Sequence, residues 1–256
     1  MVKKWKVAVP TPAGPDERWA YIYLPESYYT NPRKRYPVLY MFDGHNLFSD
    51  DEATYGKSWG LESYMDFTGT ELIIAAIECN HSPDNGRLKE YAPFDFDDAT
   101  FGHISGYGRT TMDWMTQTFK PYIDKYYRTL RGRNTTFIGG SSMGGLMSLY
   151  AVTAYNQYYS GAAALSPSLW TNPTAVESMI RYARLRPNTR VYMDYGSEEL
   201  RNHTGMKKEF QKISSMLLRK NVYLTSRIVP NGDHTEACWE KQLPFAFNTL
   251  LYKRNF

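Results

Sequence analysis

The sequence has little of several features that would assign it to a specialised class of protein. Only two cysteines, Cys79 and Cys238, occur in 256 residues, too few for the disulfide framework of a small secreted protein. Because they lie far apart along the chain, we expect two buried thiols rather than a disulfide, which favours a cytoplasmic location. The lysines and arginines are scattered and the formal net charge is only +4, so no nucleic-acid partner is expected.

Long apolar runs are also missing. The run Leu72–Ile77 has the length of a strand, and the N-terminus reaches Pro10 without a long apolar stretch. We therefore expect no signal peptide, no membrane-spanning helix and no membrane partner. The sequence shows no internal repeat, low-complexity tract or linker. Its length and its apolar content of 42% suit one α/β domain, which we expect to span residues 1–256.

Strand-like and helix-like segments alternate through most of the chain. After the first two strand-like segments, each further one is separated from the next by helical sequence. This alternation predicts an α/β fold with a mostly parallel central sheet and helices on both faces. The expected strands lie near residues 4–9, 19–24, 37–42, 72–78, 135–139, 161–164, 190–194 and 222–229.

The most informative motif is Gly140-Ser-Ser-Met-Gly144, which fits the pattern G-x-S-x-G. It lies between a strand-like segment and a helical one, the context of a nucleophile elbow. Small residues flank the serine because the backbone of such a turn is strained and crowded. Ser142 is therefore a candidate nucleophile at a helix N-terminus, where amide groups can stabilise an anion. Taken alone, the motif fits a tight packing turn equally well, so the assignment depends on its partners.

The partners are expected downstream, in the order nucleophile, acid, histidine. His234 lies in a loop after the last strand-like segment, where its ring can reach the serine. A turn between Ser142 and His234 carries two carboxylates, Glu198 and Glu199. Either carboxylate can orient the imidazole, so the spacing permits a catalytic triad.

The histidine His45 follows the apolar strand near residues 37–42, where this type of fold supplies its second oxyanion donor. We expect the backbone N–H of His45 to act together with that of Met143, the residue after the nucleophile. The other histidines are expected to be structural or exposed side chains; they are His81, His103 and His203.

Together these residues resemble the putative-esterase family of α/β-hydrolases. That family includes siderophore esterases, S-formylglutathione hydrolases, feruloyl and acetylxylan esterases, and mycolyltransferases. The resemblance covers nearly the whole chain and rests on Tyr36–Asn46, Arg87–Pro93, Pro121–Asp124, Gly139–Gly145, and Gly232–His234 with Trp239 behind it. It implies that Ser142 is the nucleophile, His234 the base and Glu199 the acid. Many relatives carry an aspartate at the acid position, so Glu198 stays open as the alternative.

Residues 80–110 form a long stretch rich in loop-forming and aromatic residues. Long loops in compact domains tend to carry function, so we expect this one to shape the substrate pocket, with Tyr91 and Tyr107 contacting substrate. Equally, its aromatic side chains can pin the loop to the body. Trp170 is a further candidate for lining the cleft, and the resemblance places Arg87 near its entrance. The aspartates of the stretch do not complete a calcium loop, and no metal is expected.

The sequence thus predicts a serine carboxylic-ester hydrolase that forms an acyl-enzyme from a small, sugar-linked or aryl-linked ester. Its expected partner is a small-molecule ester, and no cofactor is expected. Two alternatives are an acyltransferase of the mycolyltransferase type, in which an alcohol outcompetes water, and a non-catalytic binding scaffold.

Overall fold

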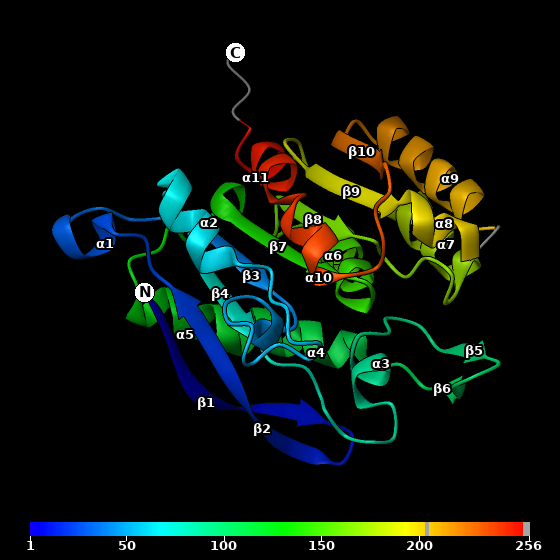
Figure 1. The fold of residues 1–256 in the computed structure, drawn as a ribbon, viewed down its shortest axis with the longest axis horizontal. Helices are drawn as coiled ribbons and strands as arrows, with labels where there is room; N and C mark the ends of the chain where they lie inside the picture. Colours follow the sequence, from blue (N-terminus) through cyan, green and yellow to red (C-terminus); the bar gives the residue numbers. More distant parts are fainter. Residues whose placement is uncertain (203–204, 253–256) are drawn as a thin grey trace.

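An eight-stranded sheet forms the centre of the computed structural model, which describes residues 1–202 and 205–252 (Figure 1). The strands lie side by side in the order β1-β2-β4-β3-β7-β8-β9-β10, and the six from β4 to β10 run parallel. The N-terminal hairpin β1–β2 joins this parallel sheet antiparallel to β4. The strand bounds are β1 Val2–Thr11, β2 Gly14–Tyr23, β3 Val38–Met41, β4 Ile73–Ile77, β7 Thr136–Ser141, β8 Gly161–Leu165, β9 Arg190–Gly196 and β10 Tyr223–Val229.

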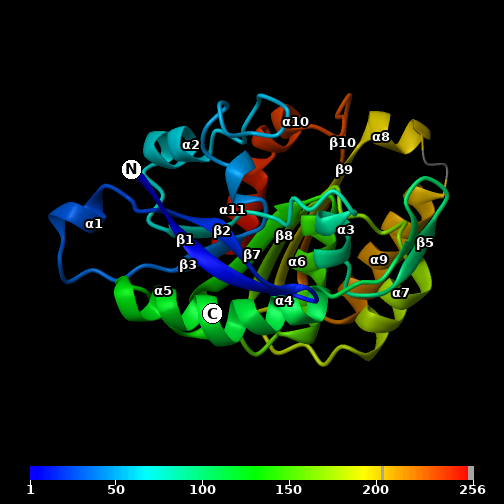
Figure 2. The same cartoon turned by 90° about the horizontal axis from the view of Figure 1, so that it is seen from below.

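Helices cover both faces of the sheet (Figure 2). One face is covered by α4 (Gly108–Trp114), α5 (Lys120–Tyr126), α6 (Met143–Ala154), α7 (Pro173–Tyr182) and α9 (Met206–Arg219), with the π-helical turn η2 (Met115–Phe119) joining α4 to α5. The other is covered by α2 (Leu61–Thr68), α10 (Glu236–Glu240) and α11 (Leu243–Leu251). The remaining elements are α1 (Ser27–Thr30), α3 (Gly86–Glu90), α8 (Ser197–Asn202), the hairpin β5–β6 (Phe96–Asp98 and Gly102–Ile104), and the 3₁₀ turns η1 (Gly44–Asn46) and η3 (Arg133–Thr135).

The two helical layers bury alternate residues of the same strands. In β3, Val38 and Tyr40 belong to the apolar cluster on the α6 face, whereas Leu39 and Met41 belong to the cluster on the α11 face. Successive side chains of a strand point to opposite faces, so a strand covered on both sides needs an unbroken apolar run. This explains why β3 and β4 are apolar at every position.

All eight expected strands are present, and the predicted mostly parallel sheet with helices on both faces is confirmed. The expectation of one long loop at 80–110 was wrong, because α3, the hairpin β5–β6 and the start of α4 lie within it. These elements have only three to seven residues each, too few to produce a hydrophobic period. Both cysteines are free and buried, as expected from their separation. Within the described part of the chain, no helix combines the length and apolarity needed to cross a membrane.

Candidate active site

The candidate site residues gather at the carboxyl ends of the parallel strands. Ser142 follows β7, His45 follows β3, Glu199 follows β9 and His234 lies in the loop after β10. The carboxyl ends of parallel strands meet at one edge of the sheet, which is where open α/β sheets bind their ligands. The topology therefore assembles residues that are up to 189 positions apart in the chain, from His45 to His234.

Ser142 is held in a strained turn between β7 and α6. Its backbone has φ 58° and ψ −122°, a region that residues with a side chain rarely adopt. Its amide donates to Leu165 O at 2.9 Å, which ties the turn to the end of β8. A side chain at Gly140 would lie 3.0 Å from the backbone of Gly144, so only glycine allows the strand and helix to approach this closely. The sequence builds an elbow that presents the hydroxyl of Ser142.

Ser142 opens into a pocket that also contains Glu199 and His234. Aromatic side chains from two other segments complete it, Phe101 from the turn of the hairpin β5–β6 and Trp170 from the loop after β8. Carboxylates line it as well, namely Asp98, Glu198 and Asp233. The pocket thus combines a hydroxyl, an imidazole and aromatic surface with an acidic surround.

Glu199 and His234 form a short charge-assisted contact. Glu199 Oε2 lies 2.6 Å from His234 Nδ1, while Oε1 accepts hydrogen bonds from Ser166 Oγ at 2.7 Å and from the backbone N–H of Gly196 at 2.8 Å. Both carboxylate oxygens are therefore fixed, and the buried carboxylate holds Nδ1 of the imidazole. The other ring nitrogen, Nε2, is then the one available to exchange a proton.

The neighbouring residue, Glu198, makes different contacts. The backbone N–H of Glu198 donates to Gly232 O at 2.9 Å, and its Oε1 accepts from Ser197 Oγ at 3.3 Å. Of the two glutamates left open by the sequence, it is Glu199 that contacts His234. His234 is also held from the side, because Trp239 packs edge-on against its ring with centroids 5.0 Å apart.

A buried chain of hydrogen bonds supports Glu199 from behind. Ser166, with a positive φ of 42°, donates to Glu199 and accepts from Trp239 Nε1 at 3.0 Å. Its backbone N–H donates to Asp194 Oδ1 at 3.1 Å, and Tyr192 OH donates to Asp194 Oδ2 at 2.6 Å. Sequence reasoning missed both Ser166 and Asp194. In the sequence, the only indication of either residue was a polar side chain near the carboxyl end of a mostly apolar strand.

Burial raises the pKa of the Asp194 carboxyl to about 6. An acid whose pKa is higher in the folded than in the unfolded state stabilises the fold below its unfolded pKa, near 4, and loses that contribution as pH rises through about 6. The shift corresponds to up to about 3 kcal/mol.

We therefore expect Asp194→Asn to gain stability relative to the wild type as pH rises from 4 to 7, by up to about 3 kcal/mol. Asparagine preserves the shape and can still accept from the Ser166 amide. Urea unfolding of both proteins over this pH range measures the difference. Asp51 is exposed, so the variant Asp51→Asn reports the background effect of losing one carboxylate. If the free energies of unfolding of wild type and Asp194→Asn changed in parallel with pH, the prediction would be contradicted.

An ion pair fixes the turn that carries His45. Arg87 binds Asp43 through two hydrogen bonds, Nε to Oδ1 at 2.7 Å and Nη2 to Oδ2 at 2.8 Å, and its Nη2 also lies 3.5 Å from Ser141 O. Burial alone would raise the pKa of the Asp43 carboxyl, but the Arg87 guanidinium lowers it below its usual value. Arg87 therefore pairs with Asp43 and is not the substrate contact that was expected. It links the η1 turn, which contains His45, to the elbow beside Ser142.

Two of the expected substrate contacts need correction. Tyr91 has no exposed surface, packs edge-on against Phe42 and accepts a hydrogen bond from the Asp43 amide, so it belongs to the core. Tyr107 accepts a hydrogen bond from Asn80 Nδ2 and lines a different pocket from the one at Ser142. The aromatic residues of 80–110 face in several directions because the segment folds into separate elements.

Trp170, in contrast, lines the Ser142 pocket as expected and packs edge-on against Phe96. Phe101, one of the aromatic residues of the stretch 80–110, is 42% exposed at the same pocket. Met143 is the first residue of α6, after β7, and His45 lies in η1, after β3, so both lie at the carboxyl ends of the parallel strands. His103 is exposed, as expected, and His203 lies outside the described residues.

The backbone at Gly196, the last residue of β9, touches the loop that carries His234. A Cβ at this position would lie 2.2 Å from Gly232 O and 2.4 Å from its carbonyl carbon. We expect Gly196→Ala to destabilise the fold by about 2–3 kcal/mol. That loss corresponds to a melting temperature about 5–10 °C lower.

Thermal unfolding followed by circular dichroism measures the effect. Gly205→Ala is the matched control, since a Cβ there meets no atom of the described residues within 4 Å and the backbone φ is −76°. Equal melting temperatures for Gly196→Ala and the wild type would contradict the close contact between the end of β9 and the His234 loop.

Comparison with known proteins adds a family match over most of the chain. The family model described as "Putative esterase" matches residues 12–250. "Uncharacterized protein YbbA" of Bacillus subtilis (strain 168) is 29% identical over 214 residues, which cover 82% of this chain and 78% of that protein.

Solved structures share the fold at lower identity. An IroE-like serine hydrolase from Shewanella oneidensis is similar with a TM-score of 0.75 and 18% identity, covering 96% of this chain and 78% of that one. A ferulic acid esterase is similar with a TM-score of 0.70 and 18% identity, covering 98% and 100% of the two chains. These likenesses extend over the whole sheet and both helical layers.

Proposed function

This chain belongs to the family described as "Putative esterase" and hydrolyses esters on an α/β-hydrolase fold, and we propose that it is a serine carboxylic-ester hydrolase. The observation that carries the serine mechanism is the 2.6 Å contact between Glu199 Oε2 and His234 Nδ1 in the pocket of Ser142. A nucleophile, a base and a group that orients the base are the components that acyl transfer through a serine requires.

In the acylation step, His234 Nε2 accepts the proton of Ser142 as Oγ attacks the ester carbonyl carbon. Glu199 holds Nδ1 of the imidazole and stabilises the imidazolium that forms. The tetrahedral intermediate then collapses, the imidazolium donates its proton to the leaving alkoxide, and the alcohol departs. The acyl group remains as an ester on Ser142.

Deacylation repeats these steps with water as the nucleophile. His234 removes a proton from water, the resulting oxygen attacks the acyl-enzyme, and the proton returns to Ser142 Oγ as the acid leaves. Because the same imidazole serves as base and then acid in each half, its orientation by Glu199 matters twice.

The negative charge that develops on the carbonyl oxygen needs donors that are already in place. We assign this role to the backbone N–H of Met143, at the start of α6, and to that of His45 in η1. The contacts of Arg87 with Asp43 and with Ser141 O link the η1 turn to the elbow, which supports this assignment. Loss of one such donor typically costs about 10²- to 10³-fold in turnover.

The pocket favours an uncharged ester with an aromatic or ring-shaped group. Phe101 and Trp170 offer flat apolar surfaces on which an aryl or sugar ring can pack. Asp98, Glu198 and Asp233 lie around the same pocket, and their negative charge disfavours a strongly anionic substrate. A similar solved structure is named as a ferulic acid esterase, which fits an aryl-linked ester.

Hydrolysis of a panel of esters tests the proposal. The panel contains p-nitrophenyl acetate to decanoate, a neutral methyl hydroxycinnamate, an acetylated sugar and an anionic succinyl ester of p-nitrophenol. We expect turnover of neutral esters and a lower kcat/KM for the anionic ester than for butyrate of equal chain length.

Adding a sugar alcohol as acceptor tests for acyl transfer, since a rise in turnover with acceptor concentration would show that the alcohol outcompetes water for the acyl-enzyme. No release of p-nitrophenol from any ester would overturn the proposal.

A further inference from the structure

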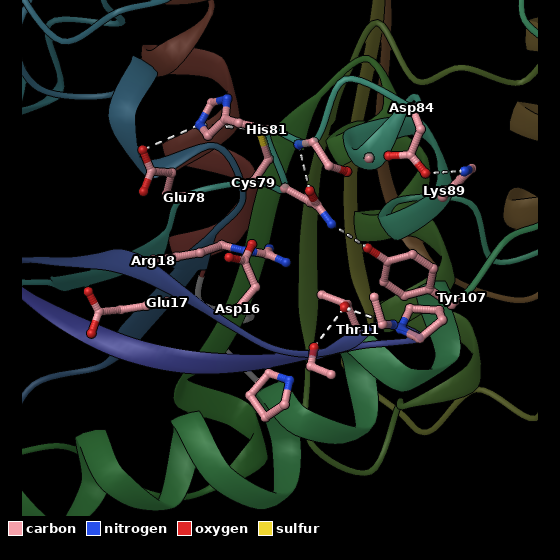
Figure 3. Close-up of a pocket in the computed structure, with 17 residues that line it drawn as sticks. Thr11, Asp16, Glu17, Arg18, Glu78, Cys79, His81, Asp84, Lys89 and Tyr107 are labelled. Carbon is pink, nitrogen blue, oxygen red and sulfur yellow. Dashed lines mark hydrogen bonds and ion pairs between the residues drawn. The ribbon is translucent and has the colours of Figure 1, made fainter.

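A second pocket at the same edge of the sheet is lined by Cys79 and His81, two side chains that the ester chemistry leaves unused. It lies between the tip of the hairpin β1–β2, the end of β4 and α3, and Figure 3 shows Cys79, His81 and Glu78 side by side within it. His45, Cys79 and His81 each offer one ligand atom, and the three atoms lie within 4.8 Å of one another. Two imidazoles and a thiol thus converge from two neighbouring loops.

The hydrogen bonds around His45 determine which of its nitrogens is free. The Thr54 hydroxyl donates to Asn46 Oδ1, an oxygen that also accepts the Thr54 backbone N–H. The hydroxyl therefore acts as an acceptor toward His45 Nε2, 3.1 Å away, and Nε2 carries the proton. His45 Nδ1 is left as a lone pair.

That lone pair is buried. His45 is 6% exposed, and Nδ1 has no hydrogen-bond partner among the described residues. A buried acceptor without a partner costs about 1–3 kcal/mol, so its retention needs a reason. A metal ion bound to Nδ1 would satisfy it, with Thr54 in the supporting position that metal-bound histidines usually have behind them.

The other two side chains complete the cluster and give access to it. Cys79 is buried with its Sγ 4.0 Å from His81 Nε2, and the His45 and His81 rings meet edge-on with centroids 4.9 Å apart. Glu78 Oε1 lies 3.3 Å from His81 Nε2. The His81 side chain is 55% exposed, so an ion can enter from solvent on its side.

We propose that His45 Nδ1, Cys79 Sγ and His81 bind a single Zn²⁺ ion, with a water molecule in the fourth position. Two imidazole nitrogens and a thiolate sulfur, with water as the fourth ligand, are a set that Zn²⁺ accepts in tetrahedral geometry, whereas Mg²⁺ and Ca²⁺ require oxygen ligands. Bonds of about 2.0–2.3 Å place such ligand atoms about 3.3–3.5 Å apart. The cluster closes to this size by movements of about 1 Å, and Cys79 releases its proton to solvent on binding.

Binding at this site acts on the esterase through His45, a consequence that rests on the proposed function. The same residue supplies an imidazole to the metal and a backbone N–H to the oxyanion. Contraction of the cluster pulls His45 toward Cys79, and a displacement of about 1 Å in a catalytic group can cost about 10²-fold in rate. Bound Zn²⁺ therefore inhibits ester hydrolysis by lowering kcat.

Cobalt(II) added to the reduced, metal-free protein tests the site directly. We expect one equivalent to bind, with the thiolate-to-cobalt charge-transfer absorption and the intense visible bands of tetrahedral Co²⁺, and Zn²⁺ to displace it. Cys79→Ser should abolish the charge-transfer band, and His81→Ala should weaken binding by about 100-fold or more. Because His81 is exposed, its loss leaves the core intact. Absence of the bands in the wild type would overturn the site.

Matched controls show whether the signal belongs to this cluster. Cys238→Ser removes the other buried thiol and His103→Ala removes an exposed histidine, and both should bind Co²⁺ as the wild type does. An unchanged charge-transfer band in Cys79→Ser, or its loss in Cys238→Ser, would overturn the assignment of the ligands.

Turnover with increasing Zn²⁺ tests the link to catalysis. We expect kcat of the wild type to fall at least about tenfold at saturation, with KM little changed, and His81→Ala to need about 100-fold more Zn²⁺. Full activity with Zn²⁺ bound would overturn the link. Co²⁺ binding to Ser142→Ala is independent of activity, so failure of the proposed ester chemistry and failure of the metal site give different results.

Discussion

Replacing Ser142 by alanine should lower ester turnover by about four or more orders of magnitude and leave the protein folded. Without Oγ there is no atom to form the acyl-enzyme, and only the oxyanion donors and binding remain. The fold should tolerate the change because Ser142 Oγ lies 3.4 Å from Ser168 Oγ, which is only a weak hydrogen bond. Initial rates with p-nitrophenyl butyrate and the melting temperature measure the two effects.

Ser168→Ala is the matched control for this prediction. It removes a hydroxyl 3.4 Å from that of Ser142 and so tests whether any nearby serine would do. We expect its turnover to fall less than about tenfold, since the nucleophile and base are retained. Retained activity in Ser142→Ala, together with inactivation of Ser168→Ala, would show that Ser168 and not Ser142 is the nucleophile.

Glu199→Gln should lower kcat by about 10³- to 10⁴-fold, the second largest effect. The orientation of the introduced glutamine amide is constrained by its neighbours. The backbone N–H of Gly196 donates to Glu199 Oε1, so a glutamine must keep its oxygen there and turn its NH₂ group toward His234. That group donates to Nδ1 and forces the proton of the imidazole onto Nε2, the nitrogen that must accept the proton of Ser142.

The adjacent Glu198→Gln variant makes the same chemical change one residue away. Glu198 also lines the pocket, but it is Glu199 that contacts the imidazole, so we expect kcat of Glu198→Gln to fall less than about tenfold. Steady-state kinetics of both variants on one ester distinguish the two carboxylates. A larger loss in Glu198→Gln than in Glu199→Gln would exchange their roles.

The positions of the strands along the chain and the turn at Ser142 were readable from sequence because their signals are local. Strands buried on both faces, such as β3 and β4, are continuous apolar runs, and helical sequence separates each parallel strand from the next along the chain. The pattern G-x-S-x-G at the junction of strand and helix identified Ser142 for the same reason, since its steric requirements lie within five consecutive residues.

The surroundings of the site were less predictable because they depend on contacts between distant segments. Tyr91 and Tyr107 are both aromatic residues in one irregular stretch, yet Tyr91 is in the core and Tyr107 lines another pocket. His81 looked like an ordinary exposed histidine, and only folding brings it beside Cys79 and His45. Composition and periodicity carry no information on which side of a short turn a side chain will lie.

By itself the sequence determined the α/β architecture and the strand-to-helix turn at Ser142, and it predicted the order serine, carboxylate, histidine, because periodicity and turn sterics are properties of neighbouring residues. Only the tertiary structure decided which glutamate contacts His234, that Arg87 pairs with Asp43, and that His45 lies against Cys79 and His81. Each of these depends on the packing of loops from different strands at one edge of the sheet, where a shift of one residue would exchange the partners.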